Sequence, residues 1–298
     1  MPRPLTASPV SFAHAVNPYP APAGSEGAVA QPVTFETMRL ARDAWPDAAR
    51  VRLFSIERAG DPPEALPEGF VRLPPLLRSV SERRAFRVPR PLPILKDILD
   101  ALFAASDEEF LIYSNADISL QPHFYATAAS IAREGFDAFA VNRRTLPPTY
   151  RGIDEIPLMC AEIGEPHMGW DCFVFRRDLY PRFDLGEVCI GTGWIGKSIL
   201  ANLSTLASRF RVFEDLHATF HIGNDKTWKR EEFSDYWIYN RSECLRILEA
   251  IERRAGPLDP NAIPGCFLRE IRRATGRGPR SGLAWRILRR LRRGIFGS

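Results

Sequence analysis

The 298-residue chain is poor in lysine, because only four of its 40 basic residues are lysines and arginine supplies the rest. It has no apolar run near the roughly 20 residues that cross a membrane. Its five cysteines are scattered and form no CxxC pair, which argues against a disulfide framework and a zinc site. The N-terminal stretch has Arg3 as its one early charge and no apolar core segment, so we expect no signal peptide. These absences predict a soluble cytoplasmic protein with reduced thiols, and the arginine bias suggests a GC-rich bacterial genome.

The positive charge is concentrated at the C-terminal end. From residue 267 onward ten arginines and one acid give +9, so the rest of this +4 chain carries −5. Residues 282–296 place apolar and basic side chains on two arcs of a helix. Such a helix can lie on an anionic membrane surface, at the inner face of the cell membrane, or dock on the body or a partner. No groove-reading module accompanies the charge, so nucleic acid is not expected. We divide the chain into a domain at 1–256 and a linker with a basic tail at 257–298.

The segment 110–118 predicts a buried strand that delivers polar groups at its carboxyl end. An apolar run from Phe110 to Tyr113 stops at small and polar residues that include Asn115 and Asp117. In open α/β sheets, ligands bind beyond the carboxyl ends of the strands. On an extended chain, residues two apart point to one side, and two oxygen donors there suit a divalent cation that also holds phosphate. The alternative is an ordinary polar turn.

Apolar segments alternate with helical patterns along the chain. Strands are predicted at 10–16, 51–56, 110–113, 137–141, 171–175, 210–213 and 218–222. Helices are predicted from an N-cap at Thr34 and at 93–103, 121–131, 197–206 and 234–254. Loops are expected at 17–31 and 145–168, the latter over the active edge of the sheet. This alternation predicts an α/β fold with a mostly parallel central sheet flanked by helices.

A second constellation, His-Ile-Gly-Asn-Asp-Lys-Thr-Trp, begins at His221. The histidine closes a predicted strand, and an imidazole can complete a metal shell begun by carboxylates. Gly223 permits a close backbone approach to a diphosphate, and Lys226 supplies a point charge for it. The alternative is a half-buried histidine followed by a surface lysine.

The order strand-N-x-D and, much later, H-x-G-x-x-K-x-W resembles the GT-A nucleotide-sugar glycosyltransferases, especially the glycogenin and galactosyltransferase type. In that family a D-x-D motif and a later histidine hold manganese, and an H-x-G-x-x-K-P-W segment grips the diphosphate. The resemblance implies a GT-A-like, Rossmann-like fold with Mn²⁺ or Mg²⁺ at Asp117 and His221, helped by Asn115. It also implies that Asn115, Gly223 and Lys226 bind the nucleotide sugar.

The resemblance covers roughly residues 10–250 and departs from the family in two places. Asn115 stands where the first Asp of the motif belongs, and Thr227 stands where Pro is usual. Asparagine still contributes an oxygen, but it brings no charge. The site would then bind metal weakly, or the pair would act mainly on ribose.

Two further residues are placed at the same site. Asp171 precedes an apolar strand and follows Trp170, whose ring offers an apolar face to a sugar. We expect Asp171 to be the catalytic carboxylate, binding sugar hydroxyls or acting as general base; the alternative is a turn aspartate. Arg143 ends the neighbouring predicted strand, where it would face a phosphate or a carboxylate.

The segment 191–198 fits the P-loop pattern G-x-x-x-x-G-K-[ST] and offers a competing function, a kinase or nucleotide triphosphatase. Against it, Trp194 and Ile195 put bulk where such a loop wraps closely round phosphate. About a hundred residues follow, too few for the sheet that this element normally begins. In the glycosyltransferase interpretation the segment is a glycine-rich loop on the acceptor side.

The sequence therefore predicts a metal-dependent hexosyltransferase. It would move a sugar from a nucleotide diphosphate sugar to a glycan or lipid-linked acceptor, as in surface polysaccharide synthesis. A third interpretation, a non-catalytic carbohydrate-binding protein with a decayed site, is permitted by Asn115.

Overall fold

The computed structural model describes residues 10–226, 229–256 and 264–275. The predicted amphipathic helix at 282–296 and most of the predicted linker lie outside these residues, and so does Thr227. Within the described part, no helix is both long enough and apolar enough to cross a membrane.

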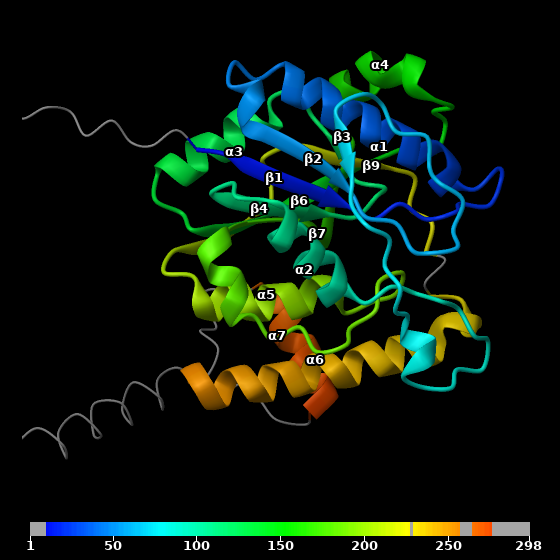
Figure 1. The fold of residues 1–298 in the computed structure, drawn as a ribbon, viewed down its shortest axis with the longest axis vertical. Coiled ribbons are helices and arrows are strands. Elements are labelled where there is room, and N and C mark those ends of the chain that lie inside the picture. The colour runs from blue at the N-terminus through cyan, green and yellow to red at the C-terminus, as the bar shows by residue number, and fades with distance from the viewer. Residues whose placement is uncertain (1–9, 227–228, 257–263, 276–298) are drawn as a thin grey trace, which may run out of the picture.

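A single sheet forms the centre of the described structure (Figure 1). Its strands run in the order β3-β2-β1-β4-β7-β6-β9-β5, and β8 pairs with β6. β7 and β5 are antiparallel to their neighbours, and all other pairings are parallel. The predicted mostly parallel sheet is confirmed. The strands are β1 Phe12–Val16, β2 Val51–Ser55, β3 Phe70–Arg72, β4 Phe110–Ser114, β5 Ser119–Leu120, β6 Ala138–Leu146, β7 Glu165–Arg176, β8 Phe210–Phe213 and β9 Thr219–Ile222.

Helices cover both faces of this sheet, as predicted. Figure 1 shows α1 and α3 on one side of the sheet and α2, α5 and α6 on the other. The short helix α4 lies near α1 and β9. The helices are α1 Glu26–Asp43, α2 Leu95–Ala105, α3 Phe124–Arg133, α4 Ile156–Ala161, α5 Ile195–Leu206, α6 Ser234–Ala255 and α7 Gly265–Thr275.

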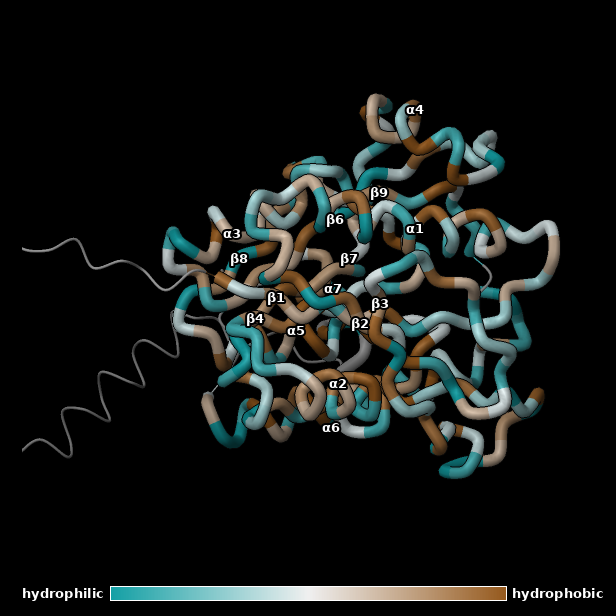
Figure 2. Tube along the Cα trace, turned by 45° about the horizontal axis from the view of Figure 1, so that its top comes forward, coloured by the Kyte–Doolittle hydropathy of each residue, from teal (hydrophilic) through white to brown (hydrophobic). Residues whose placement is uncertain are grey.

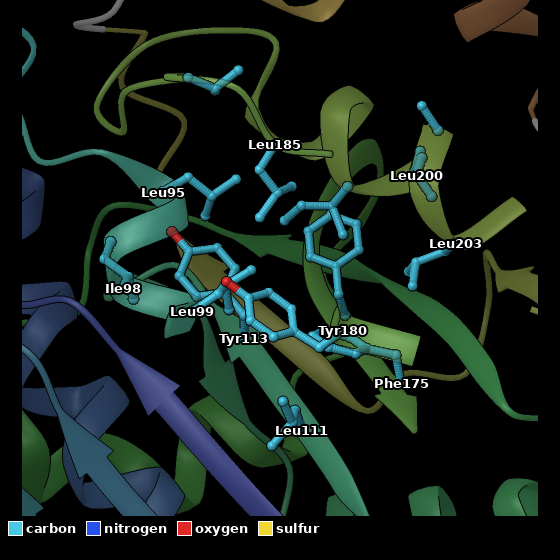
Figure 3. Close-up of a cluster of buried hydrophobic side chains, with 14 of the residues drawn as sticks. Leu95, Ile98, Leu99, Leu111, Tyr113, Phe175, Tyr180, Leu185, Leu200 and Leu203 are labelled. Carbon is cyan, nitrogen blue, oxygen red and sulfur yellow. The ribbon is translucent and has the colours of Figure 1, made fainter. Parts of the chain in front are cut away.

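Alternation along the strands divides the core into two layers. In β1, Phe12 and Val16 join the cluster under α1 and α3, whereas Ala13 and Ala15 join the cluster under α2 and α5. Figure 2 shows brown, hydrophobic stretches in the central strands and teal ones in the outer loops. In Figure 3, leucines of α2 lie beside Tyr113 of β4, so α2 packs against the strand that leads to the candidate site.

The start of α1 differs from the prediction. The helix begins at Glu26, where the Ser25 side chain caps it by accepting the Ala28 N–H at 3.3 Å. The predicted loop to Gln31 was therefore wrong, because Pro32 is tolerated inside the helix. Thr34 is not a cap. It is fully buried, and its hydroxyl lies 3.1 Å from that of Ser119.

The region 145–168 is also more ordered than the expected loop. It contains the end of β6, the helix α4 and the start of β7. The end of β6 pairs with the start of β7, and Thr145 lies opposite Glu165. Strand polarity was missed here, because a short apolar run at 171–175 carries no sign of its direction. After α4 the chain runs back along β6, so β7 lies antiparallel between β6 and β4.

Residues 265–275, assigned from the sequence to the linker and tail, form α7. Phe267 is fully buried, and its ring lies 6.1 Å from that of Trp170 in β7. This helix therefore packs into the same core as the sheet, behind the strand that carries Asp171.

Candidate functional site

Asp117 lies in a turn directly after β4. The turn is closed by a hydrogen bond of 3.1 Å from the Ile118 N–H to the Asn115 carbonyl oxygen. The extended geometry expected for this segment is therefore not found, and the two polar side chains diverge. Asn115 points to Asp171, whereas Asp117 points to His221.

His221 lies in β9 and is only 7% exposed. Its Nδ1 is 2.9 Å from the Gly223 carbonyl oxygen, which can only accept, so Nδ1 carries a proton. In the neutral ring Nε2 then has a free lone pair, and it lies 3.3 Å from Oδ2 of Asp117. Two lone pairs face each other across this gap, and either a proton or a metal cation between them satisfies both.

The surroundings of Asp117 suit a divalent metal cation that is bound to the phosphates of a substrate. Its Oδ1 is buried and has no hydrogen-bond partner among the described residues, although the side chain as a whole is 30% exposed. Adjacent ligands of an octahedral Mg²⁺, each about 2.1 Å from the ion, lie roughly 3 Å apart, close to the separation found here. Burial opposes ionisation of Asp117, but a protonated His221, through its charge and its hydrogen bond, and then Arg143 hold the pKa of Asp117 below the usual value.

The described residues include no group of three or more His, Cys, Asp or Glu side chains that could hold a metal. A resident metal needs such a cage, whereas Mg²⁺ in nucleotide sites is commonly held by one or two side chains and the substrate phosphates. The donor set of Asp117 and His221 therefore fits a phosphate-bound Mn²⁺ or Mg²⁺. The Asn115 side chain, expected to help hold the metal, points to Asp171 instead, and its Oδ1 lies 3.5 Å from the Tyr113 hydroxyl.

Asp171 is held from two sides. It forms an ion pair with Arg143, and the Asn115 side chain donates to its Oδ1 at 3.2 Å. The Asn115 N–H also donates to the Asp171 carbonyl oxygen at 3.1 Å. The Asp171 and Arg143 side chains are 18% and 13% exposed, so the pair is largely shielded from water. Asp171 thus has a fixed orientation and keeps lone pairs for a ligand hydroxyl.

His167, to which the sequence assigned no role, lies beside Arg143 at this site. Its Nδ1 accepts the Gly169 N–H at 2.8 Å, and Nε2 lies 3.4 Å from Arg143. Burial and then the nearby positive charges, chiefly Arg143, lower the pKa of His167 to about 4. One of those charges is the exposed Lys226, so Lys226 lies within electrostatic reach of the Arg143 side of the site.

The loop after β9 already holds a carboxylate. Glu26 accepts the Asp225 N–H at 2.6 Å, and a Cβ added to Gly223 would lie 2.3 Å from the Glu26 carboxyl group. Gly223 has φ +77°, so the position favours glycine on two grounds. Its own N–H donates to the Leu146 carbonyl oxygen at 2.8 Å. Gly223 thus contributes a close approach for an anion, and Glu26 occupies that position.

The P-loop alternative is contradicted by the structure of its segment. No strand precedes it, since Cys189 forms only an isolated bridge with Ile94. Lys197 forms an ion pair with Glu270 at 2.6 Å and lies over the Trp194 ring, 4.5 Å from its centroid. The lysine that would bind phosphate is therefore used to dock α7 onto α5.

Sequence reasoning brought Asp117, His221, Asn115, Asp171 and Arg143 to one site, and the structure places them together. It missed Glu26, which no motif marks and which lies 199 residues from its partner Asp225. The only available signal was an acid in the first turn of a helix, and the helix start itself was misplaced.

No protein-family model matches the chain, and no curated protein matches its sequence. Among solved structures, it is similar to S. aureus TarS 1-349 in complex with UDP-GlcNAc, at 12% identity over 80% of this chain and 67% of that chain, with a TM-score of 0.46. It spans 40% of a longer TarS chain.

Two other similar structures contain Mn²⁺. Glucosyl-3-phosphoglycerate synthase from Mycobacterium tuberculosis, with UDP-Glc and phosphoglyceric acid, gives 14% identity over 79% of this chain and 80% of that chain, with a TM-score of 0.41. The mannosyltransferase PcManGT from Pyrobaculum calidifontis, with GDP-Man, gives 13% identity over 84% and 66%, with a TM-score of 0.42. All three structures hold a nucleotide sugar. At this level of similarity, the function of this chain can be inferred only from its own residues.

Proposed function

We propose that this chain transfers a hexosyl group from a nucleotide diphosphate sugar to a glycan or lipid-linked acceptor, assisted by Mn²⁺ or Mg²⁺. The observation that carries the proposal is the 3.3 Å approach of His221 Nε2 to Asp117 Oδ2, beside a buried Asp117 oxygen that has no hydrogen-bond partner in the described part of the chain. Two hard or borderline donors at the carboxyl edge of a mostly parallel sheet suit a phosphate-bound cation.

Asp117 and His221 would hold the cation, whereas Asn115 would help to position Asp171. When bound, the cation would neutralise charge on the departing nucleotide diphosphate. Lys226, exposed on the loop after β9, would add a positive charge for the diphosphate. Gly223 would let the diphosphate approach the backbone, at the position that Glu26 occupies.

Asp171 would orient the sugar. Its two hydrogen-bond donors, Arg143 and Asn115, fix the carboxylate in place, and its remaining lone pairs can accept sugar hydroxyls. Preset orientation of this kind lowers the entropy lost when the reacting groups are aligned. Because the carboxylate is already paired with Arg143, we assign it an orienting role in preference to general-base catalysis.

A thermal-shift screen of UDP- and GDP-sugars with and without Mn²⁺, followed by calorimetry on the hits, tests this function. At least one nucleotide sugar should stabilise the protein, and Mn²⁺ should strengthen its binding. Asp117→Asn should remove the Mn²⁺-dependent part of the affinity and leave the fold intact.

The matched control is Asp107→Asn, at an exposed aspartate in the loop between α2 and β4. It should behave as the wild type. Undiminished Mn²⁺-dependent affinity in Asp117→Asn would remove the metal assignment. Binding of oligosaccharides in the absence of any nucleotide binding would instead favour a non-catalytic carbohydrate-binding protein.

A further inference from the structure

A cleft of about 1170 Å³ opens beside the loop that follows β9. Three chain segments line it, namely residues 145–148 at the end of β6, 161–165 before and at the start of β7, and 223–225; Glu26 and Arg230 complete the lining. Pockets for small molecules usually enclose about 300–1,000 Å³, so this space suits an extended ligand.

One wall of the cleft is held in shape by Arg144. Its guanidinium donates to the carbonyl oxygens of Ile163 and Gly164, both at 2.9 Å. Gly164 has φ +63°, and a Cβ there would lie 2.7 Å from the Thr145 carbonyl oxygen and from the Leu146 side chain. Only glycine permits this close packing of the turn on β6. The wall is therefore built before any ligand arrives, which lowers the entropic cost of binding.

The cleft combines apolar surface with carboxylates. Pro147, Pro148 and Ile163 supply apolar faces, and Ile163 is 67% exposed. The charged residues of the lining are Glu26, Glu162, Glu165, Asp225 and Arg230, a formal balance of −3. Carboxylates accept hydrogen bonds from hydroxyl groups, whereas they repel anionic ligands.

The cleft is continuous with the proposed donor site. Gly223 lines it, and so do Asp225 and Glu26, which meet through the hydrogen bond of 2.6 Å. A ligand in the cleft would lie next to the loop that we assign to the diphosphate, on the β6 and β9 side of the sheet.

We infer that this cleft is the acceptor site and that it takes an uncharged glycan, an assignment that rests on the proposed function. The glycan hydroxyls donate to the carboxylates, and its C–H faces pack on the prolines and Ile163. In the transfer step an acceptor hydroxyl oxygen bonds to the anomeric carbon as the bond from that carbon to the diphosphate breaks. The nucleotide diphosphate leaves with the bonding electrons, and the hydroxyl proton is released to solvent.

Three β1,4-linked tetrasaccharides of equal length test the charge preference: those of glucose, glucosamine and glucuronic acid. Their affinities for the full chain are measured without nucleotide by ligand-observed NMR titration. The neutral tetrasaccharide should bind about tenfold or more tightly than the anionic one, because like charges oppose binding. Glu165→Lys should reduce this ratio by about threefold or more, since it replaces a negative charge of the lining by a positive one. Glu249→Lys, an equal charge reversal at an exposed position of α6, should leave the ratio unchanged.

Equal or tighter binding of the anionic tetrasaccharide would overturn the inference, and so would the absence of neutral binding at millimolar concentrations. Much tighter binding of the glucosamine tetrasaccharide, or of an oligolysine peptide, would assign the acids to a cationic acceptor and would likewise overturn it. The two proposals fail separately. If nucleotide sugars bind but the neutral tetrasaccharide does not, only the acceptor assignment is lost; if no nucleotide sugar binds, the proposed function is lost.

Discussion

The Nε2 atom of His221 lies 3.3 Å from Oδ2 of Asp117, although 104 residues separate them in the chain. Their strands are not neighbours, since β7 and β6 lie between β4 and β9. The contact exists because the chain leaves β4, turns at Asn115 to Ile118, and continues into β5, which pairs with β9. Asp117 is thus carried across the carboxyl edge of the sheet to the strand that holds His221.

Lys226 and Lys197 form a matched pair for testing which lysine binds the nucleotide. Lys226→Ala should weaken diphosphate binding by about 1.5–3 kcal/mol, the scale of a hydrogen bond to a charged group. Lys197→Ala should leave the affinity within about threefold, because Lys197 is engaged by Glu270 and Trp194. It should instead lower the free energy of unfolding by about 1–2 kcal/mol, through the lost cation–π contact and ion pair.

Calorimetry with UDP and Mn²⁺ measures the first effect, and urea denaturation measures the second. The opposite ranking of the two affinities would show that the segment 191–198 binds phosphate after all.

Glu26 occupies the place near Gly223 where an anion can approach the backbone, so it should compete with the diphosphate. Glu26→Gln keeps the shape of the side chain but removes its charge, and we expect diphosphate binding to tighten by about three- to tenfold. Glu36→Gln is the control, since Glu36 lies on the same helix and pairs with Arg39. Weaker binding in Glu26→Gln would mean that the carboxylate assists the donor, for example as a metal ligand.

The ion pair of Asp171 with Arg143 should be strongly coupled. Arg143→Ala leaves a shielded carboxylate without its cation and should lower the free energy of unfolding by about 3 kcal/mol, the lower end for a broken buried pair. In Asp171→Asn that carboxylate is absent, so Arg143→Ala should cost much less there. A double-mutant cycle by urea denaturation measures the difference. Additive effects would show that the two side chains do not depend on each other.

The sequence predicted the fold class because the apolar strands and amphipathic helices alternate clearly, as at 51–56 and 93–103. It also predicted that Asp117 and His221 meet, because groups at the carboxyl ends of parallel strands gather at one edge of a sheet. Asp171 precedes the buried part of its strand and reaches the same edge because β7 is antiparallel. It could not predict that β7 runs antiparallel, since strand direction depends on the path of the chain through α4. Nor could it predict that Asn115 and Asp117 would diverge, because a turn and an extended end are equally compatible with those residues.

The contact of Glu26 with Asp225 was beyond sequence reasoning for another reason. It depends on where α1 begins, and in the sequence Gly27 and Pro32 favour a loop over a helix in that segment. Long-range polar contacts of this kind follow only from the packing of α1 against β9.

A buried histidine makes the stability of the protein depend on pH. His14 in β1 is fully buried, with Nδ1 at 2.9 Å from the Tyr125 hydroxyl and Nε2 at 2.8 Å from the Ser114 hydroxyl. Both partners can donate or accept, so the neutral ring satisfies both bonds in either tautomer. Burial lowers the pKa of His14 to about 3.

In the unfolded chain His14 titrates near pH 6.5, so below that pH the unfolded state binds a proton that the folded state refuses. Stability should therefore be independent of His14 above pH 6.5, fall as the pH drops, and level off near pH 3. The contribution approaches about 1.4 kcal/mol per pH unit, which gives roughly 1 kcal/mol between pH 6 and pH 5, before most carboxylates titrate. His14→Gln should remove this part of the slope in urea denaturation at those two pH values, whatever its constant effect on stability. His123→Gln, an exposed control whose pKa is lowered less, should change the slope less. An unchanged slope in His14→Gln would mean that the folded protein binds a proton at His14 as readily as the unfolded chain does.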